Sequence, residues 1–117
     1  MAQMLLKEGL DKDARDKNGR TPLYHAVECG HPDLVTLLIE AGADIDVQDK
    51  EGWTALHYAC AEGHASMVRT LLEAGADWEL EDENDFTPEN WASSGGHKDV
   101  VELLRAAEAK NIDMGLL

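Results

Sequence analysis

The stretch DKEGWTALHYACAEGHASMVRTLLEAGADWELE, residues 49–81, decides the fold because recognisable copies of it stand on both sides. Residues 16–48 read DKNGRTPLYHAVECGHPDLVTLLIEAGADIDVQ, and the chain from residue 82 begins DENDFTPENWASSGGHKDVVELLRAAEAK. A period of 33 residues is typical of solenoids, in which each unit buries its apolar side against its neighbours. We therefore expect the 117 residues to form one domain of stacked units.

Each unit carries the signals of two short helices. A threonine stands before the first helix, where its hydroxyl can cap backbone N–H groups, and a proline follows it in two of the units. A glycine then ends the first helix, and in two units another glycine ends the second helix. The second helices carry apolar residues at helical spacing. The capping and stop residues are Thr21, Thr54, Thr87, Gly30, Gly63, Gly96, Gly42 and Gly75.

These motifs resemble those of a known family. TPLYHA begins at Thr21, TALHYA at Thr54 and the degraded TPENWA at Thr87, and all three align with the TPLHxA signature of ankyrin repeats. The chain is similar to ankyrin repeat proteins over essentially its whole length. The resemblance implies an all-α solenoid of β-turn, helix, helix units. It also implies a concave face, lined by the turn tips and first helices, that binds other proteins.

The aligned copies place repeats 1, 2 and 3 at residues 16–48, 49–81 and 82–114, after half a repeat at residues 1–15. The half repeat has no first helix, so Leu5 and Leu6 have no apolar partner within their own unit. Two explanations remain open: the chain is a fragment of a longer array, or a second copy covers this surface in a homodimer. Polar outer faces are expected at the free ends of solenoids, and this end does not clearly have one.

Repeat 3 has the features of a capping unit. AEAK at residues 107–110 replaces the AGAD of the earlier repeats, so we expect its second helix to run on by a turn or more. Glu89 and Arg105 stand in columns that hold leucine or isoleucine in repeats 1 and 2. Such polar substitutions suit the end of a stack.

Charge limits the classes of partner. The chain has 24 acidic residues against 10 Lys and Arg, a formal charge of -14, so it should repel nucleic acids and anionic membranes and attract basic proteins. It has neither an apolar run long enough to span a membrane nor the core of a signal peptide.

The two cysteines of the chain, Cys29 and Cys60, should remain reduced because adjacent repeats lie too far apart for a disulfide. We expect a cytoplasmic or nuclear protein.

Histidines and motifs predict no enzyme, metal or cofactor. His31, His64 and His97 recur at the repeat period, so about 10 Å separates them in a stack, too far to share one zinc ion. We expect them to form hydrogen bonds in the loops. His57 occupies the signature position that bonds to the turn, whereas Tyr24 replaces it in repeat 1, whose turn should be held differently. The chain lacks dinucleotide, phosphate-loop and nucleophile motifs.

The concave face is the predicted binding site. Trp53 and Phe86 occupy the same turn column, so they should project side by side and anchor a partner; alternatively, each ring folds back over its own turn. Between Arg69 and Lys98 there is no Lys or Arg, so the acidic residues there either attract a basic partner or serve only as solvated surface. The predicted partner-binding residues are Lys17, Asn18, Arg20, Glu28, Lys50, Glu51, Trp53, Glu62, Glu83, Asp85 and Phe86.

These observations predict a non-enzymatic module that binds a protein or peptide rich in Lys or Arg. A structural or self-associating segment of a larger repeat protein is the alternative.

Overall fold

The computed structural model describes the backbone of residues 13–116 and the side chains of residues 13–108. This part of the chain folds into six α-helices and contains no strand, which confirms the predicted all-α class. The helices are α2 (Pro22–Glu28), α3 (Pro32–Glu40), α4 (Ala55–Glu62), α5 (Ala65–Glu73), α6 (Pro88–Ser94) and α7 (Lys98–Leu116). Most of the predicted half repeat, residues 1–12, lies outside the described residues.

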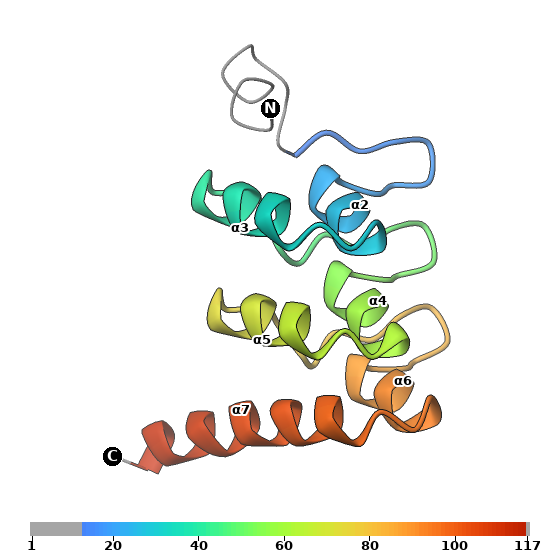
Figure 1. Ribbon diagram of the computed structural model, residues 1–117. Coiled ribbons are helices and arrows are strands. Elements are labelled where there is room, and N and C mark those ends of the chain that lie inside the picture. Colours follow the sequence, from blue (N-terminus) through green and yellow to red (C-terminus); the bar gives the residue numbers. More distant parts are fainter. Residues whose placement is uncertain (1–12, 117) are drawn as a thin grey trace.

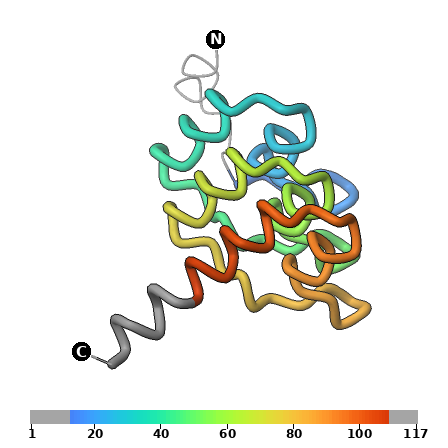
Figure 2. Tube along the Cα trace, turned by 60° about the horizontal axis from the view of Figure 1, so that its bottom comes forward, coloured from blue at the N-terminus to red at the C-terminus, as the bar shows by residue number. Residues whose placement is uncertain are grey.

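The helix pairs form a linear, two-layered stack (Figure 1). The first helices α2, α4 and α6 lie in one layer, and the second helices α3, α5 and α7 form the other. The turn loops lie on the side of the first helices that faces away from the second helices. Figure 2, which brings the bottom of the stack forward, shows the three pairs in the same order. The linear arrangement is the one that the repeat period predicted.

The first helices begin and end as their residues predict. Thr54 has extended backbone angles (φ −97°, ψ 171°), and its hydroxyl accepts a hydrogen bond from the backbone N–H of His57 at 3.2 Å. Thr21 and Thr87 cap α2 and α6 in the same way. At the other end of α4, Gly63 adopts the left-handed conformation (φ 75°), which glycine reaches without steric cost. Each first helix is therefore delimited by its own local sequence.

The core lies between the layers and between successive repeats. Its largest fully buried aliphatic side chains are Leu23, Leu56, Leu71, Leu104, Val27, Val35, Val68 and Val100, and three pairs among them stand one repeat apart: Leu23 and Leu56, Val35 and Val68, and Leu71 and Leu104. Cys60 is also buried within this core. Trp78 is partly buried and packs against it. Because neighbouring repeats share this core, each one depends on the next for its stability.

The turn loops form a hydrogen-bonded edge along the stack. Within a repeat, the backbone N–H of the first aspartate donates to the carbonyl four residues later, from Asp49 to Trp53 at 2.8 Å and from Asp82 to Phe86 at 2.9 Å. Between repeats, the N–H of Glu83 donates to the carbonyl of Glu51 at 3.0 Å. Successive turn tips are thus held in contact, so equivalent turn residues stand next to each other.

The last helix is longer than its counterparts, as the missing glycine predicts. α7 has 19 residues, whereas α3 and α5 have 9 each. Arg105 Nε lies 3.7 Å from Glu89 Oε2, so the two polar residues that replace apolar ones here pair with each other. Because Arg105 is 70 % exposed, such a pair contributes only about 0–1 kcal/mol. The main effect of this pair is to make the end of the stack polar, and its contribution to stability is small.

Candidate binding surface

The surface is built on an aspartate that opens each turn. Asp82 is buried, with 4 % of its surface exposed. Its Oδ1 accepts hydrogen bonds from the backbone N–H groups of Asn84 (2.9 Å) and Phe86 (3.0 Å), and these bonds shape the turn. Its Oδ2 accepts a hydrogen bond from the indole N–H of Trp91 on α6 at 2.8 Å. One carboxylate therefore shapes the loop and orients an aromatic ring.

These donors keep Asp82 ionised. Burial alone would raise the pKa of its carboxyl group, but hydrogen bonds from the backbone of Phe86, the indole of Trp91 and the backbone of Asn84 outweigh burial and lower that pKa below its usual value. The ring of Trp91 is consequently tied to a permanent charge, and hydrogen bonds to ionised groups are stronger than those between neutral ones.

The turn aspartates of repeats 1 and 2 form equivalent hydrogen bonds with other donors. Asp16 Oδ2 lies 2.7 Å from His25 Nε2, and Asp49 Oδ2 accepts a hydrogen bond from Arg20 Nε at 3.3 Å. The backbone N–H of Arg20, followed by the His25 ring, lowers the pKa of Asp16 to about 2. In each turn, Oδ1 of the aspartate thus shapes the loop, and Oδ2 positions a side chain. These side chains lie on the face formed by the first helices and the turns, which we call the first-helix face.

Five aromatic rings follow one another across the three repeats along this face, and the first of them, Tyr24, is buried with 3 % of its surface exposed. We call them the aromatic row: Tyr24, Tyr58, Trp53, Trp91 and Phe86. The ring centroids are 5.7 Å apart for the first pair, 6.5 Å for the second, 5.0 Å for the third and 5.3 Å for the last. Aromatic pairs attract each other at about these separations, so each ring supports the next.

The two aromatic residues predicted as anchors belong to this row but do not contact each other directly. Trp91 lies between them, 5.0 Å from Trp53 and 5.3 Å from Phe86. Phe86 is 44 % exposed and Trp53 is half-buried. Trp53 also stacks on His57, with centroids 6.2 Å apart and planes inclined by 27°. Part of the Trp53 ring is thus folded back over its own repeat, and the rest contacts the neighbouring one.

His57 fixes the base of the row. It is fully buried; its Nδ1 accepts from the backbone N–H of Thr54 at 3.2 Å, and its Nε2 lies 3.0 Å from the carbonyl oxygen of Phe86. Burial lowers the pKa of His57, so the ring is neutral at pH 7 and Nε2 carries the proton. In repeat 1, Tyr24 takes this position, and Arg20 bonded to Asp49 supplies a link to the next turn. Repeat 1 therefore holds its turn differently, as predicted.

The predicted charged residues fall into two groups. Arg20 is paired within the chain: its guanidinium nitrogens lie 3.5 Å from Glu28, 3.3 Å from Asp49 and 4.0 Å from Glu51. Glu62 is exposed and lies near the row, because it follows Tyr58 by four residues on the same side of α4. Burial, followed by the charge of Glu62, raises the pKa of Tyr58. The other predicted residues are exposed at the turn tips: Lys17, Asn18, Lys50, Glu83 and Asp85.

Comparison with known proteins agrees with this architecture. A profile for ankyrin repeats (3 copies) matches residues 41–115, more than half of the chain, and one for ankyrin repeats (many copies) matches residues 5–59. The chain belongs to the ankyrin repeat family. Ankyrin repeats are generally protein–protein interaction modules without enzymatic activity. No curated protein matches the chain.

Two residues of this ankyrin surface, Tyr58 and Trp91, were not among the predicted anchors. Both occupy the variable position of the signature, one residue after His57 and Asn90. That column contains His25, Tyr58 and Trp91, and its two large aromatic residues could have indicated from the sequence that this position contributes to the surface. Both rings are half-buried.

Other candidate sites lie away from the row. Among the described residues, no group of three His, Cys, Asp or Glu could hold a metal ion, and no helix has the length and hydropathy to cross a membrane.

The three histidines that recur at the repeat period differ in their contacts. His97 Nε2 lies 3.1 Å from the carbonyl oxygen of Ala61, as expected of a loop-bonding histidine, whereas His31 and His64 are exposed without a capping bond. The loop-bonding prediction therefore holds for His97 alone.

The two thiols differ in accessibility. Cys29 is exposed, and both cysteines are free, as predicted. Burial raises the pKa of the Cys60 thiol to about 12, so this group is inert at neutral pH.

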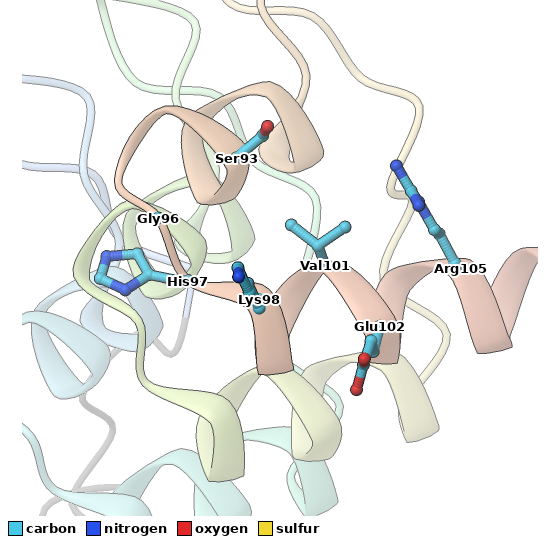
Figure 3. A pocket seen from close by; sticks show the side chains of 7 residues that line it. All are labelled: Ser93, Gly96, His97, Lys98, Val101, Glu102 and Arg105. Carbon is cyan, nitrogen blue, oxygen red and sulfur yellow. The ribbon is translucent and has the colours of Figure 1, made fainter.

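A cavity of about 310 Å³ opens on the outer face of repeat 3 (Figure 3). Ser93, Val101 and Arg105 line it and stand in columns whose earlier members, such as Cys60 and Val68, are buried between repeats. Val101 is half-buried, and Arg105 extends along the rim. The cavity thus occupies the side on which a further repeat would pack, on a face made polar by substitution.

Proposed function

We propose that this chain is a non-enzymatic binding module that holds a basic partner protein or peptide across the aromatic row of its concave face. The supporting observation is the row itself, in which three half-buried rings and one exposed ring continue without interruption from repeat 2 into repeat 3. Tryptophan, tyrosine and arginine carry most of the binding energy at protein interfaces. The first-helix face corresponds to the face that other ankyrin repeats use.

The rings are ordered before a partner arrives. Trp91 is held by its hydrogen bond to Asp82, and Trp53 is held between His57 and Trp91. A side chain that is already immobile loses little conformational entropy on binding, which otherwise costs about 0.5–1.5 kcal/mol for each flexible side chain. This preorganisation favours the use of the row as an anchor.

The surrounding charge favours a basic partner. Glu62, Glu83 and Asp85 are exposed around the row, and the formal charge of the chain is -14. Such a field accelerates encounters with cations and disfavours acidic competitors. Exposed charges are screened over about 8 Å at physiological ionic strength, so added salt should weaken the association. Binding that is insensitive to salt would contradict the electrostatic part of the proposal.

Affinity capture compares the wild type with a Trp53→Ala, Phe86→Ala double variant. A protein retained only by the wild type is then purified, and its dissociation constant is measured for each single variant. Trp53→Ala should weaken binding by on the order of 2 kcal/mol if this ring is a hot spot. Phe86→Tyr keeps a ring at the exposed position and is the conservative control. An unchanged affinity of the Trp53→Ala variant would remove the row from the site.

Light scattering on the same preparation addresses the alternative of a self-associating segment. A binding module without a partner should show the chain mass of 12.8 kDa, whereas a homodimer formed through the N-terminal half repeat should show twice that mass.

We also propose that residues 1–117 form one ankyrin domain in which repeat 3 caps the stack. The support comes from its outer face, where Glu89, Ser93 and Arg105 replace residues that are apolar and largely buried in repeats 1 and 2. Desolvating these polar groups beneath a further repeat would cost free energy.

A further inference from the structure

Repeat 1 contains a complete cation site at the N-terminal end of the aromatic row. The guanidinium carbon of Arg20 lies 4.9 Å from the centroid of the Tyr24 ring. The same group is within 4.0 Å of carboxylate oxygens of Glu28, Asp49 and Glu51. Stacking on a ring and pairing with carboxylates are the two interactions that the planar, weakly hydrated guanidinium group makes best.

Repeats 2 and 3 carry aromatic rings in place of this cation. Trp53 and Phe86 occupy the column of Arg20, so the residue that supplies the guanidinium in repeat 1 is an aromatic ring in the next two repeats. Within residues 13–108, the only cation recorded over a ring is Arg20. Carboxylates nevertheless continue along the row, with Asp82 bonded to Trp91.

Two further carboxylates flank this part of the row. Glu62 is exposed and lies four residues after Tyr58 on the same side of α4, and Glu83 is exposed on the turn that carries Phe86. The rings of repeats 2 and 3 are therefore surrounded by negative charge that no neighbouring Lys or Arg of residues 13–108 balances in a recorded ion pair.

We propose that the rings of Trp53, Trp91 and Phe86 bind arginine side chains of the partner, whose guanidinium groups pack on the accessible parts of these rings while the exposed carboxylates of Glu62 and Glu83 supply the opposite charge. This inference rests on the proposed function and names the residue type that the site recognises. It assigns to the rings of repeats 2 and 3 a contact between a guanidinium and a ring like the one that Arg20 makes with Tyr24, at other positions of the repeat.

The chemistry of the row favours arginine over lysine. Trp91 packs directly against Trp53 at 5.0 Å and against Phe86 at 5.3 Å, with planes inclined by 57° and 74°, and Phe86 is 44 % exposed. A guanidinium group is planar and weakly hydrated and stacks well on an aromatic ring, whereas a compact ammonium group is more strongly hydrated and gains less from such a contact.

The test compares three unstructured peptides of equal length, in which glycine alternates with arginine, with lysine or with trimethyl-lysine. Quenching of tryptophan fluorescence reports binding at low salt. The arginine peptide should bind the wild type about two- to fivefold more tightly than the lysine peptide, the factor expected of one exposed cation–π contact. Phe86→Ala should reduce this preference, and Phe86→Tyr should retain it.

Charge variants separate the two parts of the interaction. Glu62→Gln and Glu83→Gln should weaken the arginine and lysine peptides by similar factors, because a lost carboxylate acts on either cation. Glu73→Gln, an exposed residue at the end of α5 in the other helix layer, is the matched control and should leave both affinities unchanged. Circular dichroism of each variant establishes that it is folded.

Four outcomes overturn the inference: equal affinity for the arginine and lysine peptides, tighter binding of trimethyl-lysine, a preference for arginine that survives both Phe86→Ala and Trp53→Ala, or no binding of any peptide. None of these removes the proposed function, which fails only if the affinity of the captured partner is unchanged by Trp53→Ala. The two results are therefore distinguishable.

Discussion

Gly52→Ala tests the close contact between successive turns. Gly52 has φ 82°, a left-handed conformation that costs an L-residue about 1–2 kcal/mol. A Cβ atom there would lie 2.8 Å from Asp82 Cα and 2.8 Å from the backbone nitrogen of Glu83, so the next turn would have to move. Added to a cost of about 1–3 kcal/mol for overpacking, the expected loss is about 2–5 kcal/mol. Typical domains unfold with only about 5–15 kcal/mol.

Gly75→Ala is the matched control. Gly75 also has a positive φ, 93°, but a Cβ atom there would meet nothing within 4 Å. This variant should lose only the conformational cost of about 1–2 kcal/mol. Urea denaturation followed by circular dichroism measures both free energies of unfolding, with equal slopes required for the comparison. Equal losses for the two variants would refute the argument that backbone contact between turn tips stabilises the stack.

Three further perturbations test the turn, the ring and the buried histidine. Asp85 occupies the position of Gly52 in repeat 3 with φ 67°, so Asp85→Gly should raise the free energy of unfolding by up to about 1 kcal/mol in the same urea titration. Trp91→Phe keeps a ring but leaves Oδ2 of buried Asp82 without its donor, and should cost about 1.5–3 kcal/mol; a loss below that range would contradict a strong bond. Burial lowers the pKa of His57, so below the unfolded-state value of about 6.5 the unfolded chain binds a proton that the folded chain does not, and stability falls as pH decreases toward the folded-state pKa. The fall should be shallower in His57→Asn, and equal pH profiles would exclude His57 as its cause.

Local chemistry explains why so much of the fold could be predicted from the sequence. Thr54 at the N-cap and Gly63 at the helix end act within a few residues, so their roles can be inferred without knowing the rest of the structure. The repeat period then supplies the long-range information, because equivalent positions must have equivalent neighbours. The length of α7 followed from the same reasoning, since no glycine stands where Gly42 and Gly75 end the other second helices.

The contacts of the aromatic row were predicted less completely because they run between columns. Alignment suggested that Trp53 would stand beside Phe86, its equivalent one repeat later. In the structure, Trp53 contacts Trp91, which belongs to another column and is drawn into place by a hydrogen bond to Asp82. Aligning the repeats identifies which residues are equivalent. A contact between residues of different columns also depends on the direction of each side chain. For Trp91 that direction is set by its hydrogen bond to Asp82, which the alignment does not reveal.

The turn aspartates show how repeats with the same backbone can carry different side chains on their surface. In repeats 1 and 3 the aspartate receives a donor nine residues later, from His25 or from Trp91. In repeat 2 that position holds Tyr58, and Asp49 is bonded to Arg20 of the preceding repeat. Where the aspartate is buried, as Asp49 and Asp82 are, the variable position of the helix can therefore change only if another donor satisfies the carboxylate, since a buried carboxylate without a partner is costly. In repeat 3 the side chain at this position also stabilises the turn, so substitutions of Trp91 that alter the proposed binding should also alter stability, whereas substitutions at exposed Phe86 should separate the two.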